Sequence, residues 1–179
     1  MGHVAPLVVT LALPDDLQRE LDALRRRWFP AGRTAVGAHL TLFHAVPGEH
    51  EGQVRSDLAD GAGRGPVPVR LSRVMSLGRG AAYAVDSPEL VRRHRALQQG
   101  WEPWLTRQDQ QPLRAHVTLQ NKVDASVARE TVEALRATFR PVEVEAEGFD
   151  LWRYEGGPWA HLERFGFAGG APVTFPDPV

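Results

Sequence analysis

The sequence predicts an α+β fold, in which mainly antiparallel β-sheets carry helices on their outer faces. Apolar segments typical of strands alternate with segments of helical periodicity along the 179 residues. Glycine-containing turns join two pairs of strands as tight hairpins, the connection that antiparallel strands use. Two short histidine motifs, with the segments that follow them, recur at a constant offset. Together these observations predict one domain with two similar lobes rather than two independent domains.

The first third of the chain alternates strands and helices. The helix over 15–28 is predicted from Leu17, Leu21 and Leu24 at helical spacing, with acidic residues in its first turn. A weaker helix follows and ends at the glycines around residue 62. The expected order is a strand over 7–13, the helix over 15–28, a loop over 30–38, a strand over 39–45 and the weaker helix over 49–60.

The rest of the chain contains two predicted hairpins. Strands over 67–77 and 81–86 pair across Gly78-Arg79-Gly80, and strands over 142–154 and 159–167 pair across Glu155-Gly156-Gly157-Pro158. Ser87 is expected to cap a helix that has Pro88 at its first position. The segments between the hairpins are that helix to about residue 105, a polar loop over 106–114, a strand over 115–122 and a helix that Asp124 or Ser126 caps and that runs to 139.

The two histidine motifs are His39-Leu40-Thr41-Leu42 and His116-Val117-Thr118-Leu119. In a strand, residues two apart share a face. Each motif is therefore expected to bury its two apolar residues in a core. It then presents an imidazole and a hydroxyl, roughly 6–7 Å apart, on the opposite face.

The motifs lie 77 residues apart, from residue 39 to residue 116, and the offset persists beyond them. It superimposes apolar positions and the two glycine turns, which predicts an internal duplication over about 39–85 and 116–162 within a single domain of 1–179. The matched apolar pairs are Val46 with Val123, Leu58 with Leu135, Val67 with Val144 and Val85 with Leu162. The segment over 168–179 is rich in glycine and proline, and we expect a flexible tail there.

Composition removes several classes of function. The chain has no cysteine, which excludes disulfides, cysteine zinc sites and thiol catalysis. Its net charge of −1 disfavours a long electrostatic footprint on nucleic acid but leaves a local basic cleft open. The apolar run over 7–13 is too short to span a bilayer and has no basic segment before it. We expect a cytoplasmic monomer that binds no membrane.

The paired motifs suit acid–base chemistry on a phosphate. Imidazoles titrate near pH 6.5, so one can take a proton from water while the other gives a proton to a leaving alkoxide. The threonine hydroxyls can donate to the charged phosphate oxygens. The candidate catalytic residues are therefore His39 and His116, the candidate phosphate-binding residues are Thr41 and Thr118, and no metal or other cofactor is expected.

The motifs, with Phe43 and His44 after the first and Gln120-Asn121-Lys122 after the second, resemble the two-histidine phosphoesterase superfamily. Within it, the chain is similar to the bacterial 2′-5′ RNA ligase (LigT-like) or RNA 2′,3′-cyclic phosphodiesterase branch. Leu151-Trp152-Arg153-Tyr154 extends the likeness, which covers nearly the whole chain. The resemblance implies two pseudo-symmetric lobes with the motifs lining a central cleft. It also implies that His39 is the acid on the leaving 3′ oxygen and His116 the base for water.

Strand parity adds further candidates for substrate contact. Phe43 and Gln120 share the histidine faces of their strands, and Phe43 is expected either to stack on a base or to pack at a lobe edge. Arg114 either neutralises phosphate or is solvated, and Tyr154 either contacts substrate or belongs to the core. His44 falls on the apolar face and is expected to be structural. Lys122 follows the same parity as Gln120 and either contacts a nucleotide phosphate or, as we expect, is exposed to solvent.

The predicted function is metal-independent hydrolysis of 2′,3′-cyclic phosphates, at RNA ends or on small nucleotides, to 2′-phosphates. A 2′-5′ RNA ligase or a 2′-5′ oligonucleotide phosphodiesterase could use the same site, because ligation resembles the reverse of such cleavage. An RNA-end-binding module without catalysis is the alternative from another class. The natural substrate and its base preference stay open at this point, as do ligation in the cell and the assignment of acid and base.

Overall fold

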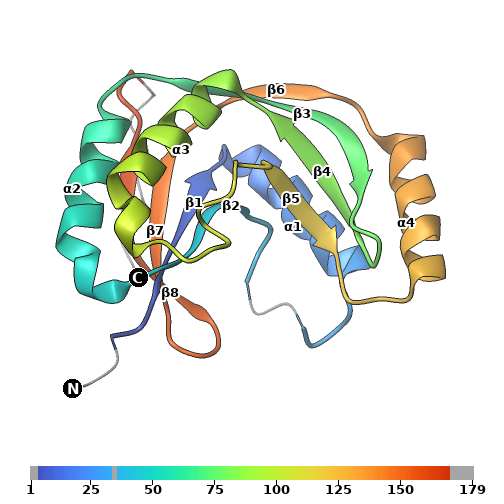
Figure 1. Cartoon of the computed structure of the whole chain (residues 1–179). Coiled ribbons are helices and arrows are strands. Elements are labelled where there is room, and N and C mark those ends of the chain that lie inside the picture. The colour runs from blue at the N-terminus through green and yellow to red at the C-terminus, as the bar shows by residue number, and fades with distance from the viewer. Residues whose placement is uncertain (1–3, 34–35, 170–179) are drawn as a thin grey trace, which may run out of the picture.

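The computed structural model describes residues 4–33 and 36–169 and confirms the predicted α+β fold. Two four-stranded antiparallel sheets form its centre, and four α-helices pack around them (Figure 1). Sheet A has the order β2–β1–β7–β8, and sheet B has the order β5–β4–β3–β6. The bounds in sheet A are β1 Leu7–Ala12, β2 Leu40–Val46, β7 Gly148–Tyr154 and β8 Trp159–Gly166; those in sheet B are β3 Val67–Ser76, β4 Ala81–Asp86, β5 His116–Gln120 and β6 Val142–Ala146.

The helices begin and end close to where the sequence predicts. The Ser87 side chain accepts a hydrogen bond from the Leu90 N–H and donates one to the Pro68 carbonyl, which confirms the predicted cap of α3. α3 ends earlier than expected, and a short 3₁₀ helix follows it. The bounds are α1 Asp15–Trp28, α2 Glu51–Ala62, α3 Pro88–Trp101 and α4 Ala125–Thr138, with 3₁₀ helices η1 Gly48–His50 and η2 Glu102–Trp104. None of these helices has the length and apolar character needed to cross a membrane.

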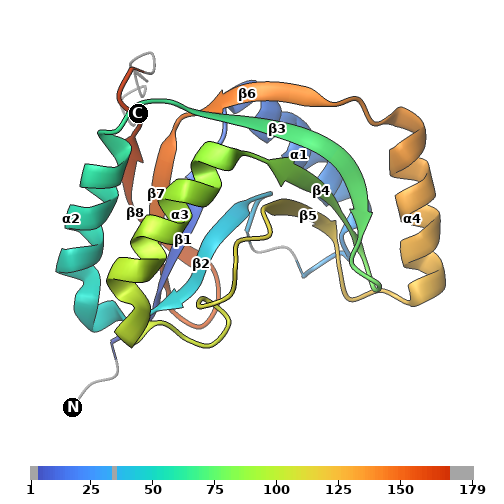
Figure 2. The same cartoon turned by 45° about the horizontal axis from the view of Figure 1, so that its top comes forward.

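The last predicted hairpin needs one correction. Residues 142–154 do not form a single strand, because the chain passes from sheet B to sheet A at Glu147. β6 pairs with β3, whereas β7 pairs with both β1 and β8. Gly148 begins β7 where a Cβ would lie 2.3 Å from the Phe165 carbonyl oxygen, so this close approach requires glycine. β3 and β6 of sheet B run side by side across the top of the molecule, and the chain continues from β6 into β7 of sheet A (Figures 1 and 2).

The halves of the chain interlock through their long helices. Arg25 on α1 donates a hydrogen bond of 2.7 Å to the Thr118 carbonyl on β5, and α1 packs against that strand. His94 on α3 lies 3.0 Å from the Leu42 carbonyl on β2. Each motif strand is therefore held by a helix from the other half of the chain.

The apolar residues of both motifs are buried, as predicted: Leu40, Leu42, Val117 and Leu119 are at most 2% exposed. The predicted flexible tail begins with Ala168, whose N–H donates to the Ala62 carbonyl. Residues 170–179 of that tail lie outside the described residues.

Candidate active site

The two motif strands meet because each is the edge strand of its sheet. β2 ends the order of sheet A, β5 ends the order of sheet B, and the two strands contact one another (Figure 2). A pocket of about 450 Å³ opens where they meet. It is lined by His39 and Thr41 from β2 and its approach, and by His116 and Thr118 from β5. The structure thus brings together all four residues that the motifs nominate.

Both catalytic candidates are held in the same way. His39 Nδ1 lies 2.7 Å from the Gly37 carbonyl oxygen, and His116 Nδ1 lies 2.6 Å from the Arg114 carbonyl oxygen. A carbonyl only accepts hydrogen bonds, so each Nδ1 must carry the hydrogen. Nε2 is then the nitrogen of each ring that is free to take or give a proton.

The environment of His39 favours its neutral form. Burial lowers the pKa of His39, the hydrogen bond to the Gly37 carbonyl opposes that effect, and the nearby positive charges of Arg25, His44 and His116 lower the pKa further. The Trp159 ring, at the start of β8, contributes to this burial, with its centroid 4.8 Å from that of His39. Trp159 also lines the pocket, although strand parity gave no reason to select it.

A β-bulge follows the threonine in each motif strand. Thr10 pairs with Thr41 while Val9 pairs with Phe43, so Leu42 is an extra residue. In β5, Ala82 pairs with Thr118 while Ala81 pairs with Gln120. Each bulge changes which face the following residues occupy.

The bulges correct the prediction that Phe43 and Gln120 face the site. Phe43 is 0% exposed, and Gln120 is 3% exposed. The Phe43 ring stacks on His94 at 4.6 Å and packs against Trp101 at 4.8 Å. Phe43 therefore belongs to the core, and neither residue lines the pocket.

The same bulge turns His44, predicted on the apolar face, into the pocket wall. Its Nδ1 lies 3.0 Å from Asp109 Oδ1, and that carboxylate also accepts the backbone N–H groups of His44 and Ala45. Burial tends to raise the pKa of Asp109, but these hydrogen bonds outweigh it and lower the pKa. Asp109 is 1% exposed and lies in a segment that the sequence marked only as a polar loop.

The loop before β5 forms one wall of the pocket. Gln98 on α3 donates hydrogen bonds to the carbonyls of Asp109 and Gln111, which fixes the loop against the helix. Arg114, at its end, is exposed and lines the pocket, as one of its two predicted roles requires.

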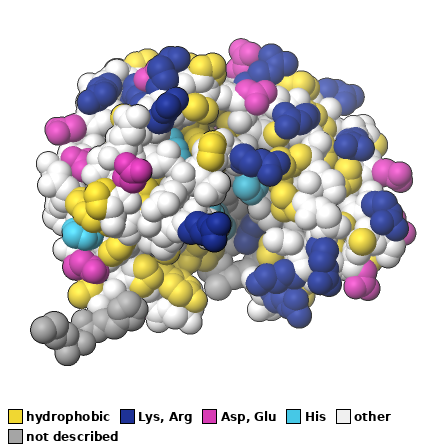
Figure 3. Space-filling view, in the orientation of Figure 1, with side chains coloured by type: hydrophobic (Ala, Val, Ile, Leu, Met, Phe, Trp, Pro, Cys, Tyr) yellow, Lys and Arg dark blue, Asp and Glu magenta, His cyan; other side chains and the backbone are white. Residues whose placement is uncertain are grey.

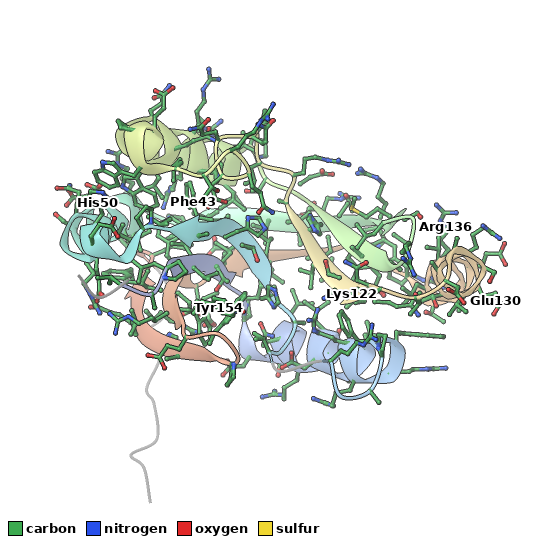
Figure 4. The ribbon with its side chains drawn as sticks, turned by 60° about the horizontal axis from the view of Figure 1, so that its bottom comes forward. Phe43, His50, Lys122, Glu130, Arg136 and Tyr154 are labelled. Carbon is green, nitrogen blue, oxygen red and sulfur yellow. The ribbon has the colours of Figure 1, made fainter. Side chains whose placement is uncertain are left out.

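Two further candidates lie elsewhere. Tyr154 is 42% exposed at the end of β7, and Lys122 follows β5 (Figure 4). Neither lines the pocket. The substrate contact considered for Tyr154 therefore has no support from its position, and its exposure contradicts the alternative of a core role; Lys122 is exposed, as expected.

The pocket offers two hydroxyls and two imidazole Nε2 atoms that have no hydrogen-bond partner among the described residues, with Arg114 in its lining. Figure 3 shows lysine or arginine and histidine side chains around the central hollow. Among residues 4–33 and 36–169, no three His, Asp or Glu side chains form a group that could hold a metal ion. The arrangement can bind an anion and move protons on both sides of it.

Comparison with known proteins gives one family and several structures. The model of the 2′-5′ RNA ligase superfamily matches residues 13–158. No curated protein sequence matches the chain. The protein TT0787 of Thermus thermophilus has a similar structure, with a TM-score of 0.65 and 22% identity over 93% of this chain and 100% of that one.

Structures of Escherichia coli LigT are also similar. The complex with 3′-AMP gives a TM-score of 0.63 and 20% identity over 92% of this chain and 99% of that one. The complex with NADP⁺ gives a TM-score of 0.60 and 19% identity over 93% of this chain and 99% of that one. At these identities, the structures show a shared fold.

Proposed function

The chain belongs to the 2′-5′ RNA ligase superfamily of two-histidine phosphoesterases, and we propose that it hydrolyses 2′,3′-cyclic phosphates of RNA ends or nucleotides without a metal. The observation that carries the proposal is the matched pair of imidazoles. Each has Nδ1 fixed on a backbone carbonyl, and each lines the same pocket beside a threonine. The LigT structure with 3′-AMP supports nucleotide binding by this fold.

In the proposed reaction, His116 Nε2 takes a proton from water as the water oxygen attacks phosphorus. The bond from phosphorus to the 3′ oxygen breaks, and His39 Nε2 protonates that oxygen, which leaves a 2′-phosphate. Thr41 and Thr118 donate hydrogen bonds to the non-bridging oxygens as charge develops on them. Because burial lowers the pKa of His39, its protonated form depends on the negative charge of the bound phosphodiester.

Ligation is a second candidate, because the family is named for a 2′-5′ RNA ligase. It would use the same groups in the reverse direction: a 5′-hydroxyl would be the leaving group of cleavage and the nucleophile of ligation. A module that binds RNA ends without turnover is the third possibility. It would leave the two free Nε2 atoms without a chemical role.

One experiment tests the proposal. The protein is incubated with the four nucleoside 2′,3′-cyclic monophosphates, and with a short RNA that ends in a cyclic phosphate, in the presence of EDTA. The products are identified by ³¹P NMR, with the His39→Ala/His116→Ala double variant as the control. We expect 2′-phosphates from the wild-type protein only.

A loss of turnover in EDTA that added metal restores would contradict the metal-free mechanism. A 3′-phosphate product would show that the bond from phosphorus to the 2′ oxygen breaks instead of the bond to the 3′ oxygen. Joined products with a 5′-hydroxyl RNA, in place of hydrolysis, would favour ligation.

A further inference from the structure

The pocket continues onto the open face of sheet B. Residues that pair across antiparallel strands share a face of the sheet. His116 pairs with Ala84, and Ala84 pairs with Arg73, so these three residues form one row across β5, β4 and β3. The neighbouring row is Thr118, Ala82 and Met75. In both rows, an alanine separates the catalytic motif from a longer side chain on β3.

These small residues leave a groove beside the active site. It has a volume of about 580 Å³, and Arg73 and Met75 on β3, Ala84 on β4 and Val91 on α3 line it. Leu113 and Arg114 line both this groove and the active-site pocket. Within their shared row, two strand spacings separate Arg73 on β3 from His116 on β5, or about 10 Å. The groove is therefore an extension of the site rather than a separate cavity.

The charge of the groove favours an anionic ligand. Arg73 and Arg114 are exposed, and within the described part of the chain neither forms an ion pair or a side-chain hydrogen bond. Arg92 also lines the groove but pairs with Glu89 at 2.7 Å. Asp86 is the one acidic residue in its lining and lies at the end of β4 beside α3. Two arginines are thus available for phosphate groups.

Among the described residues, the corresponding row of sheet A is occupied by paired polar side chains. Thr41 pairs with Thr10, and Thr10 pairs with Asp150, so the equivalent row carries a carboxylate on its third strand. Arg164 neutralises that carboxylate with hydrogen bonds of 2.8 and 2.9 Å. The indole of Trp152 covers Thr10, to which its Nε1 donates. The side of sheet B, with its groove and two exposed arginines, is therefore the better place for a ligand longer than the pocket.

We propose that this groove binds the single-stranded RNA immediately 5′ of the reactive cyclic end, which makes an RNA end, and not a free nucleotide, the preferred substrate. The proposal rests on the function proposed above. Arg114 and Arg73 contact successive phosphates, while Met75, Val91 and Leu113 contact sugars and bases. None of the residues that line the groove is aromatic, so the preference is for a strand and not for a base sequence.

The test compares two substrates of the same 3′ base: a nucleoside 2′,3′-cyclic monophosphate and a tetraribonucleotide with a 2′,3′-cyclic end. The measured quantity is kcat/KM for the oligonucleotide divided by kcat/KM for the mononucleotide. Arg73→Gln should lower this ratio about five- to tenfold, since it removes one phosphate contact to the oligonucleotide. It should also reduce the salt dependence of log Kd for the oligonucleotide by about 0.7.

Arg70→Gln is the matched control. Arg70 lies on the same strand and pairs with Glu143 at 3.1 Å, and it does not line the groove. The control should keep the wild-type ratio. Val91→Glu is a second variant, at a site 47% exposed on α3, and its added charge in the groove should lower the ratio as well.

Binding of a labelled tetraribonucleotide with a 2′-phosphate end, followed by fluorescence anisotropy, separates this proposal from the proposed function. If the protein hydrolyses the mononucleotide, shows no preference for the oligonucleotide and binds it equally well as Arg73→Gln, the proposed RNA-binding role of the groove is wrong. The proposed hydrolysis of cyclic phosphates would still hold. Oligonucleotide binding that depends on Arg73, without turnover of either substrate, would support the groove and overturn the function.

Discussion

One hydrogen bond to a backbone carbonyl decides which ring nitrogen of each candidate catalytic histidine can transfer a proton. With Nδ1 of His39 and His116 held by carbonyl oxygens, each ring has a single nitrogen left for proton transfer. His39→Ala and His116→Ala should each lower kcat on a cyclic phosphate by about 10²- to 10⁴-fold, the scale of a positioned proton-transfer group. Steady-state kinetics on a cyclic mononucleotide measures the loss.

Thr41→Val and Thr118→Val should lower kcat less, because each removes one donor to the phosphate and leaves the acid–base pair intact. His50→Ala is a suitable control, since His50 stacks on Trp104 and does not line the pocket (Figure 4). A His39→Ala protein with a near wild-type rate would place the chemistry elsewhere.

The pH dependence should reveal the two roles. The wild-type kcat/KM should follow a bell-shaped profile, because one imidazole acts neutral and the other protonated. In His116→Ala the remaining limb belongs to His39, and the rate should fall as pH rises through the pKa of His39. That pKa is lowered, so the midpoint should lie below 6.5 in kcat/KM, and the bound phosphate should shift it upward in kcat.

The His39→Ala variant should show the opposite limb, with a rate that rises with pH. If the two variants exchange their limbs, the acid and the base exchange roles. A rate that rises continuously to pH 10 in the wild-type protein would exclude both imidazoles as the titrating pair.

At the scale of single elements, the two β-bulges explain where strand parity fails. Regular alternation locates His39, Thr41, His116 and Thr118 correctly, because they precede the bulges. It misplaces Phe43, Gln120 and His44, because they follow them. A bulge arises from the pairing of two strands, and a single sequence shows no pairing.

Asp109 accepts backbone N–H groups of β2 beside its bulge and so stabilises it. The sequence did not predict this role, because it too depends on contacts between distant segments. The partners of Asp109 lie more than 60 residues away along the chain, at His44 and Ala45. Asp109→Ala should lower the free energy of unfolding by about 3 kcal/mol, because it leaves buried N–H groups without an acceptor. Urea unfolding at pH 7 measures the change.

Asp109→Asn is the comparison, because the amide keeps one acceptor oxygen and should retain part of that stability. A loss below about 1 kcal/mol in Asp109→Ala would show that water satisfies these N–H groups instead. The variant should also weaken activity, since His44 and the loop before β5 form one wall of the pocket.

At the scale of the whole molecule, two histidines with lowered pKa values, the half-buried His39 and the buried His94, should make stability depend on pH. Burial lowers the pKa of His39 and of His94. More than about one pH unit above 6.5, both rings are neutral in the folded and unfolded states, and they add no slope. Below 6.5 the unfolded chain binds protons that the folded protein resists, so the free energy of unfolding should fall as pH decreases toward the folded pKa values.

Urea unfolding between pH 7 and 5.5 measures this slope, and His94→Gln should reduce it. The difference between the two proteins is decisive, because burial raises the pKa of Glu147, which favours the folded state in acid. An equal slope in both proteins would show that His94 protonates freely in the folded state.

The sequence predicted the class of fold and most elements, because hydrophobic periodicity, caps and glycine turns are local signals. It did not reveal that the chain passes from β6 to β7 at Glu147. The two strands are separated by this one residue and both have strand-like sequences, so they read as one continuous strand. That passage is set by pairing with β1, β3 and β8, which no local pattern encodes. The internal duplication over 39–85 and 116–162 stays a prediction, although the same order of strand and helix follows each motif.

The pairing of β1 with β7 has a consequence for synthesis on the ribosome. β1 emerges first among the strands, yet one of its two neighbours in sheet A lies about 140 residues later. Until that segment leaves the exit tunnel, the apolar β1 has an unpaired edge, which is a hazard for aggregation. Contacts this distant also slow folding, so the nascent chain should depend more on chaperones than its modest size suggests.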